Sequence, residues 1–155
     1  MVQSSGLLLY RRTESGGVEA LIGHMGGPYW EGKQEHAWSV PKGLHDHGEH
    51  QALAVALREF EEEMGSPPPD GPTIDLGSVK SGRKTITVFA REGDFVAESA
   101  ASNTFTMEWP PGSGRREEFP EIDEALWCGT TEARSLLSKS QVTFIDRLLD
   151  HLAAD

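Results

Sequence analysis

The sequence has little cysteine and little positive charge. Its 155 residues include one cysteine, Cys128, which cannot form an internal disulfide or build a cysteine-rich zinc scaffold. A single thiol fits a reducing compartment, so we expect a cytoplasmic protein. Fourteen Lys and Arg against 25 Asp and Glu give a net charge of −11, which disfavours binding to a nucleic-acid polymer or a membrane by charge alone.

Long hydrophobic runs are missing as well. The apolar run from Leu7 to Tyr10 is four residues long and is followed by arginines. In a secretory signal, the positive charges precede the apolar stretch, and that stretch is longer. No run approaches the length of a membrane span, so we expect neither a signal peptide nor a membrane partner. A chain of this length corresponds to about one domain, and we expect residues 1–155 to form it.

Short apolar runs alternate with turn residues along the chain. Runs rich in β-branched or aromatic residues predict strands at 6–11, 18–23, 38–40, 74–79, 85–91, 103–109 and 124–128, with the first two joined as a hairpin. Helices are predicted at 49–64, 131–137 and 140–153, and 110–120 is interpreted as a loop. This mixture favours an α/β sandwich around one core.

The predicted helix at 49–64 holds a dense group of acids. On a helical projection, an apolar stripe that should face the core lies opposite three glutamates spaced i, i+3 and i+4. The stripe consists of Leu53, Leu57, Phe60 and Met64, and the glutamates are Glu59, Glu62 and Glu63. Like charges at this spacing near a helix C-terminus cost a few tenths to about 1 kcal/mol each. A solvated acidic face is the simplest interpretation, but such carboxylates can also converge on Mg²⁺ or Mn²⁺.

Neighbouring residues favour the metal site. Arg58 lies next to Glu62 on the projection and can hold its carboxylate, and Gly43 ends a Pro-Lys-Gly turn that can offer a backbone carbonyl. With Glu49 and Gly65, these residues resemble the Nudix box, whose pattern is G-x5-E-x7-R-E-U-x-E-E-x-G-U, where U is a bulky apolar residue. The half R-E-U-x-E-E-x-G matches residues 58–65 completely.

Two positions depart from that pattern. Eight residues separate Glu49 from Arg58 where the family has seven, and Ser66 stands where an apolar residue is usual. An extra residue in the loop or the first helical turn leaves the metal-binding half undisturbed. Inside the helix, the extra residue would rotate Glu49 by about 100° relative to Arg58. If the pattern is instead aligned with seven residues before Arg58, His50 occupies the position of the first glutamate. In the family this position mainly braces the arginine.

The resemblance extends beyond the box. Residues 38–43, W-S-V-P-K-G, are similar to the W-x-x-P-K-G entry of Nudix enzymes that cleave nucleoside triphosphates, dinucleoside polyphosphates or diphosphoinositol phosphates. Residues 119–127 resemble the segment before the family's last strand. The resemblance implies an α/β/α sandwich with a mixed curved β-sheet between helices. It also implies hydrolysis of a nucleoside diphosphate linked to another group, with a nucleoside triphosphate or dinucleoside polyphosphate expected and ADP-ribose or a diphosphoinositol phosphate as alternatives.

The same resemblance implies roles for individual residues. Mg²⁺ or Mn²⁺ would be bound by Glu59, Glu62, Glu63 and the Gly43 carbonyl. The general base lies either in the box or in the loop before the last strand, where Glu121 ranks first and Glu118 second, ahead of Glu117. Further candidates for substrate binding are Lys42, Arg115 and Arg116 for phosphates, and Tyr29 and Trp30 for stacking on a base.

Other interpretations remain open. A zinc site is one of them: His45, His47 and His50 surround the box and His24 and His36 precede it, but their spacing matches no common structural zinc pattern. A catalytically silent nucleotide-binding sensor on the same fold is a second possibility, and an acidic interaction domain is a third. The sequence is compatible with a monomer or a homodimer.

Overall fold

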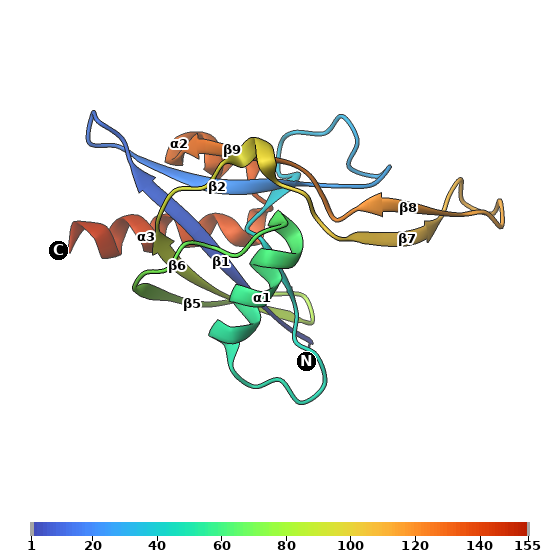
Figure 1. Ribbon diagram of the computed structural model, residues 1–155, viewed down its shortest axis with the longest axis horizontal. Coiled ribbons are helices and arrows are strands. Elements are labelled where there is room, and N and C mark those ends of the chain that lie inside the picture. The colour runs from blue at the N-terminus through green and yellow to red at the C-terminus, as the bar shows by residue number, and fades with distance from the viewer. Residues whose placement is uncertain (1, 155) are drawn as a thin grey trace.

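The computed structural model describes residues 2–154 and contains a mixed seven-stranded sheet with helices on both faces (Figure 1). The strands follow the order β3-β2-β1-β6-β5, with β4 paired to β1 and β9 paired to β2. Their bounds are β1 Val2–Arg12, β2 Val18–Met25, β3 Trp38–Ser39, β4 Lys42–Leu44, β5 Thr73–Ser81, β6 Lys84–Glu92 and β9 Ile122–Gly129. None of the helices formed by residues 2–154 is long and apolar enough to cross a bilayer.

Strand β1 is the centre of the sheet and pairs with three partners. Its C-terminal end pairs antiparallel with β2, as the predicted hairpin requires, and it pairs in parallel with β6 from Val2 to Tyr10. Its N-terminal end pairs antiparallel with β4, so that Ser5 lies opposite Gly43. Strand β3 ends before Pro41, as expected for a strand that meets a proline. The sequence did not predict that the chain re-enters the sheet directly after Pro41 as β4, which brings the Pro-Lys-Gly turn onto β1.

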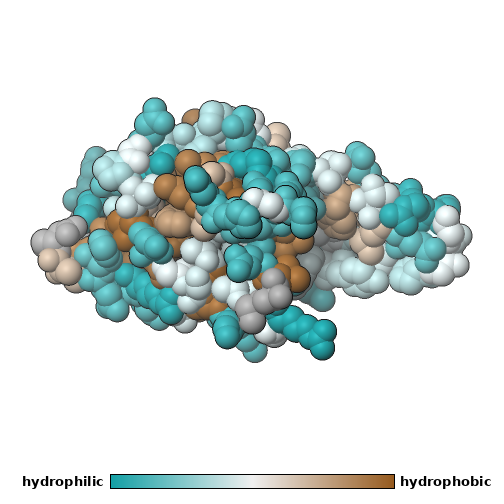
Figure 2. Space-filling model, turned by 90° about the horizontal axis from the view of Figure 1, so that it is seen from below, coloured by the Kyte–Doolittle hydropathy of each residue, from teal (hydrophilic) through white to brown (hydrophobic). Residues whose placement is uncertain are grey.

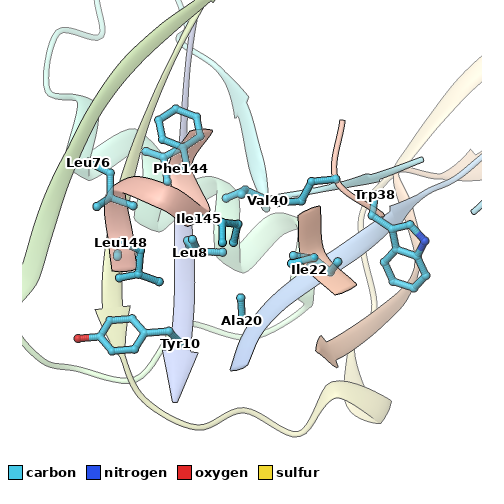
Figure 3. Packing of buried hydrophobic residues seen from close by; sticks show 14 of the residues in the cluster. Leu8, Tyr10, Ala20, Ile22, Trp38, Val40, Leu76, Phe144, Ile145 and Leu148 are labelled. Atoms are coloured by element: carbon cyan, nitrogen blue, oxygen red, sulfur yellow. The ribbon is translucent and has the colours of Figure 1, made fainter. Parts of the chain in front are cut away.

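Helices cover the two faces of the sheet. Helix α1 (Ala52–Met64) packs on one face, and α2 (Thr130–Leu136) and α3 (Val142–Ala153) pack on the other, with short 3-10 turns at Ala97–Ser99 and Lys139–Gln141. Successive side chains of β1 alternate between the faces: Leu7 and Leu9 join the α1 cluster, and Leu8 joins the α3 cluster. Figure 3 shows the second cluster, in which α3 contributes Phe144, Ile145 and Leu148. The protein therefore has the expected α/β/α sandwich.

Helix α1 differs from its prediction in its start and its buried face. It begins at Ala52, because Gly48 has a positive φ of 88° and Glu49 is held in a turn by a hydrogen bond from its N–H to Asp46 O. It ends at Met64 with Gly65 in the left-handed conformation, as predicted. Its buried side chains are Val55, Ala56, Glu59, Phe60, Glu63 and Met64, whereas Leu53 and Leu57 are only half-buried. Placing Glu59 and Glu63 opposite the core was therefore wrong.

A second, two-stranded sheet projects from the body as an arm (Figure 1). Strand β7 (Thr104–Glu108) pairs antiparallel with β8 (Arg116–Pro120), and Phe105 faces Phe119 across the pair. The prediction of a loop over 110–120 was wrong for residues 116–120. The strand there depends on pairing with β7, which its own sequence, R-E-E-F-P, does not indicate. Figure 2 shows the same arm, with mainly hydrophilic residues at its tip.

Candidate active site

The Gly43 backbone lies directly against the carboxylate of Glu59. Pairing of β4 with β1 holds Gly43 in place, and packing of α1 on the same face of β1 brings Glu59 to it. A Cβ atom at position 43 would overlap the Glu59 carboxylate. Because only glycine allows this approach, the contact between strand and helix explains why the Pro-Lys-Gly turn ends in that residue.

Arg58 connects three glutamates of the predicted box. Its Nη1 donates to Glu59 Oε1 and to Glu62 Oε1, both at 3.0 Å, and its Nη2 donates to Glu49 Oε1 at 2.8 Å. Glu49 also accepts a hydrogen bond from the Asp46 N–H, and this bond together with Arg58 lowers the pKa of Glu49. The extra residue between Glu49 and Arg58 therefore lies in the loop before α1, where it leaves the ion pair intact.

Glu59 and Glu63 are buried, so the interpretation as a solvated acidic face is wrong for both. They are 8% and 9% exposed. Burial raises the pKa of Glu63 to about 8, and the charges of Glu59 and Glu121 add to this shift. Lys42 opposes the shift through its charge and through its backbone N–H, which donates to Glu63 Oε1 at 3.2 Å. Burial also raises the pKa of Glu59, and the charge of Glu62 adds to it. Both carboxyl groups have lost water without gaining full neutralisation.

These residues line a cavity of about 560 Å³, a volume within the usual range for small-molecule sites. One wall is formed by β4, α1 and the connection between β8 and β9, and it includes Lys42, Gly43, Glu59, Glu62, Glu63 and Glu121. A smaller cavity of about 150 Å³ shares Lys42, Glu63 and Glu121 and adds Trp30 and Phe105. Trp30 therefore approaches the glutamates, while Tyr29 instead packs edge-to-face on Trp109, with ring centroids 5.4 Å apart.

Glu121 is tied to the end of α1 through Asn103, a residue that the sequence did not indicate. The Glu121 N–H donates to Asn103 O at 2.9 Å, and the Asn103 N–H donates to Glu62 O at 2.8 Å. Asn103 belongs to no motif, and only the close approach of three distant segments reveals its place. The remaining loop candidates are on or beside β8 and line neither cavity; they are Arg115, Arg116, Glu117 and Glu118.

The histidines are dispersed among other partners. His24 is hydrogen-bonded to Asp123 and to Lys33 O, His36 to Leu137 O, and His45 to Ser5 Oγ. In the part of the chain that the structure describes, residues 2–154, no three His, Cys, Asp or Glu side chains are gathered in the geometry of a metal site. Three of the box glutamates point to Arg58 instead.

The residues of the cavity nevertheless fit a hard divalent cation in their chemistry. Carboxylate oxygens from Glu59, Glu62 and Glu63, with the Gly43 carbonyl beside them, are the donors that Mg²⁺ and Mn²⁺ prefer. The raised pKa of Glu63 indicates a buried acid that lacks a cation of sufficient charge nearby. A cation would supply the missing neutralisation.

Comparisons with known proteins identify the family and support the fold. The NUDIX domain family model matches residues 3–151. A Caenorhabditis elegans Ap4A hydrolase binary complex is similar over 100% of both chains, with 18% identity and a TM-score of 0.64. The NUDIX domain of Shewanella oneidensis NrtR complexed with ADP ribose has 12% identity and a TM-score of 0.67, with 98% of this chain and 88% of that chain covered. NrtR complexed with a 27mer DNA has 12% identity and a TM-score of 0.61, with 98% and 62% covered.

At these identities the structural likeness shows the fold alone, and no curated protein matches the sequence significantly. The family model, however, spans nearly the whole chain. The box residues at 43 and 58–65 occur together in the fold, at the contact between β4 and α1. The protein therefore belongs to the Nudix family.

Proposed function

We propose that this protein is a metal-dependent Nudix pyrophosphohydrolase. Its substrate is a nucleoside diphosphate linked to another group, with a nucleoside triphosphate or a dinucleoside polyphosphate as the expected class. The observation that supports this most directly is the pair of buried carboxyl groups, Glu59 and Glu63, beside the Gly43 backbone in a cavity of about 560 Å³. The structural likeness to an Ap4A hydrolase is consistent with the substrate class.

Mg²⁺ or Mn²⁺ held by Glu59, Glu62, Glu63 and the Gly43 carbonyl would neutralise the diphosphate, polarise a phosphoryl oxygen and acidify a water. Arg58 keeps the Glu59 and Glu62 carboxylates in position through its two 3.0 Å hydrogen bonds. Glu49 fixes the other end of the same guanidinium. The chain thus supplies an oxygen-lined wall whose carboxylates are oriented before the substrate arrives.

Glu121 is the proposed general base, because it lines the cavity and its charge acts on Glu63. Glu118 is the weaker candidate, since it lies on β8 outside the cavity. Lys42 would pair with a non-bridging phosphate oxygen, and Trp30 would stack on a base next to Glu63 and Glu121. Tyr29, Arg115 and Arg116 lie farther out and are assigned no step.

A nucleotide-binding sensor without catalytic activity is the alternative function, and ADP-ribose is the alternative ligand because the NrtR domain was found with ADP ribose. The NrtR structure with DNA makes nucleic-acid binding a second alternative to test. For this chain we retain the prediction that no nucleic-acid polymer is bound, because the net charge is −11. A cytoplasmic location and a monomer or homodimer also stay predictions.

The decisive experiment is a substrate panel with Mg²⁺ and Mn²⁺ against Glu62→Gln and Glu63→Gln. The panel contains dinucleoside polyphosphates, (d)NTPs, ADP-ribose and diphosphoinositol phosphates. Glu61→Gln is the matched control, because Glu61 lies on the same helix but is exposed and lines neither cavity. We expect metal-dependent turnover that both test variants lose and the control retains.

Turnover without metal, or turnover that survives both substitutions, would contradict the proposed mechanism. Tight nucleotide binding without hydrolysis of any panel member would favour the sensor. Activity on ADP-ribose without activity on triphosphates or dinucleoside polyphosphates would replace the proposed substrate class.

A further inference from the structure

The cavity has a second wall, and its residues differ in chemistry from the carboxylates. This wall is built from the N-terminal end of β1, the turn between β5 and β6, and the segment between α2 and α3. Its polar residues are Ser4, Ser81, Lys84, Ser138, Ser140 and Gln141. All five acidic residues that line the cavity come from elsewhere: Asp46, Glu59, Glu62, Glu63 and Glu121.

The serine hydroxyls of this wall are available to a ligand. Within residues 2–154, the side chains of Ser4, Ser81, Ser138 and Ser140 make no hydrogen bond, whereas most other serines do. Ser4 is the clearest case because it is only 7% exposed yet lines the cavity. A hydroxyl can both donate and accept hydrogen bonds, so these serines are suited to a polar ligand in the cavity.

The wall is held firmly by Gln141. Its Nε2 donates to Ser39 Oγ at 3.0 Å, and its Oε1 accepts from the Val40 N–H at 2.8 Å. The Ser138 N–H donates to Trp38 O at 2.8 Å. The two serines at 138 and 140 are therefore fixed to β3 and its extension, and they form a preorganised surface.

The charge of this wall is positive. Residues 81–84 and 138–141 contain Arg83, Lys84 and Lys139 and no Asp or Glu, although the whole chain carries −11. Lys84 lines the cavity and makes no salt bridge with any residue in the described range 2–154. Hydroxyl donors together with an unpaired ammonium group are suited to a phosphate oxygen and would repel a metal cation.

We propose that this wall is a second phosphate subsite, which binds a phosphoryl group of the substrate distant from the hydrolysed bond. Lys84 supplies the charge, and Ser4, Ser138 and Ser140 donate hydrogen bonds. The assignment to substrate rests on the proposed function. It makes the enzyme selective for substrates with phosphates beyond the reacting diphosphate, as in a dinucleoside tetraphosphate, over ADP-ribose.

Binding of a phosphate group is tested first without hydrolysis. Amide NMR of the metal-free protein in EDTA is recorded during titration with inorganic phosphate, against chloride at equal ionic strength. We expect saturable shifts at Ser81, Lys84, Ser138 and Ser140 that Lys84→Met removes. Lys80→Met is the matched control, because Lys80 is also exposed but lies one residue from Ser81 on the opposite face of β5. No saturable shift, or a shift unchanged in Lys84→Met, overturns the subsite.

Steady-state kinetics tests whether the phosphoryl group bound at this subsite belongs to the substrate. We expect Lys84→Met, and the double variant Ser138→Ala/Ser140→Ala, to raise KM for a dinucleoside tetraphosphate about tenfold while KM for ADP-ribose changes less than about twofold. Ser66→Ala is the serine control, since its hydroxyl also makes no hydrogen bond within residues 2–154 but Ser66 does not line this cavity. Equal effects on both substrates, or phosphate binding without a KM effect, would overturn the assignment to substrate. An enzyme inactive on every substrate would refute the proposed function while the NMR titration still decides the subsite.

Discussion

Two segments of this chain are built from the same three residue types, Arg, Glu and Phe, and lie in very different environments. Residues 58–63, R-E-F-E-E-E, form the end of α1, and residues 115–119, R-R-E-E-F, enter β8. On α1, Glu59 and Glu63 are buried, and Arg58 donates hydrogen bonds to Glu59 and Glu62. On β8, Glu117 and Glu118 are exposed on an arm that projects from the body. Burial against a glycine backbone distinguishes the acids of the candidate site from those of the arm.

Replacing a buried glutamate should have the largest effect. Glu63→Gln keeps the shape of the side chain but removes a charge from the wall where the metal would bind, so kcat/KM should fall by about 10³-fold or more. Initial rates with Mg²⁺ and calorimetric Mn²⁺ titration measure the two losses. Retention of more than a tenth of the activity would remove Glu63 from the proposed mechanism.

Filling the space at Gly43 should have the next largest effect. Gly43→Ala puts a Cβ into the Glu59 carboxylate, so either the strand or the side chain must shift, and we expect a loss of about 10²-fold in kcat/KM. Gly129→Ala is the matched control, because a Cβ there would meet no atom within 4 Å and its φ is −65°. Equal activity of the two variants would show that Gly43 is not needed for the site.

Removing the hydrogen bond between Glu49 and Arg58 should have a moderate effect on kcat/KM. Glu49→Ala deletes the 2.8 Å bond to Nη2 but leaves the bonds to Glu59 and Glu62. Residues that orient metal ligands typically contribute 10- to 100-fold, and we expect a value near about tenfold. Full activity of Glu49→Ala would show that the turn before α1, which contains the extra residue, does not contribute to catalysis through Arg58.

The buried acid should also make stability depend on pH in a definite direction. Because the pKa of Glu63 is raised to about 8 from an ordinary value of 4.5, its proton stabilises the folded state below pH 4.5 and this contribution is lost as pH rises through 8. In EDTA, the wild-type Tm should therefore fall between pH 6 and 9 by several degrees more than that of Glu63→Gln. Parallel Tm curves for the two proteins would contradict the raised pKa.

The smallest effect is expected on the arm. Glu118→Gln changes an exposed side chain that lines neither cavity, so kcat/KM should stay within about twofold and the Tm should not change measurably. The same assays apply. A loss comparable to that of Glu121→Gln would make Glu118 the general base and would require the arm to close over the cavity.

Local sequence patterns predicted much of the fold. Most strands, the hairpin of β1 and β2, the C-terminal end of α1 and the two later helices lie close to their expected positions, because apolar spacing and turn residues act over a few residues. Strands β4 and β8 were missed since they depend on partners distant in sequence. The helical projection was misleading because it assumed that all buried side chains of α1 are apolar.

The sequence by itself determined the family and led to the proposed set of oxygen donors, because the spacing of residues 58–65 is local and a helix converts it directly into geometry. Only the tertiary structure decided which acids are buried, because that depends on how closely β4 approaches α1. It also decided that Glu121 lies at the cavity while Glu118 lies on the arm. The serine and lysine wall opposite the glutamates is likewise a product of folding, since its parts come from three segments far apart in the chain and no local pattern connects them.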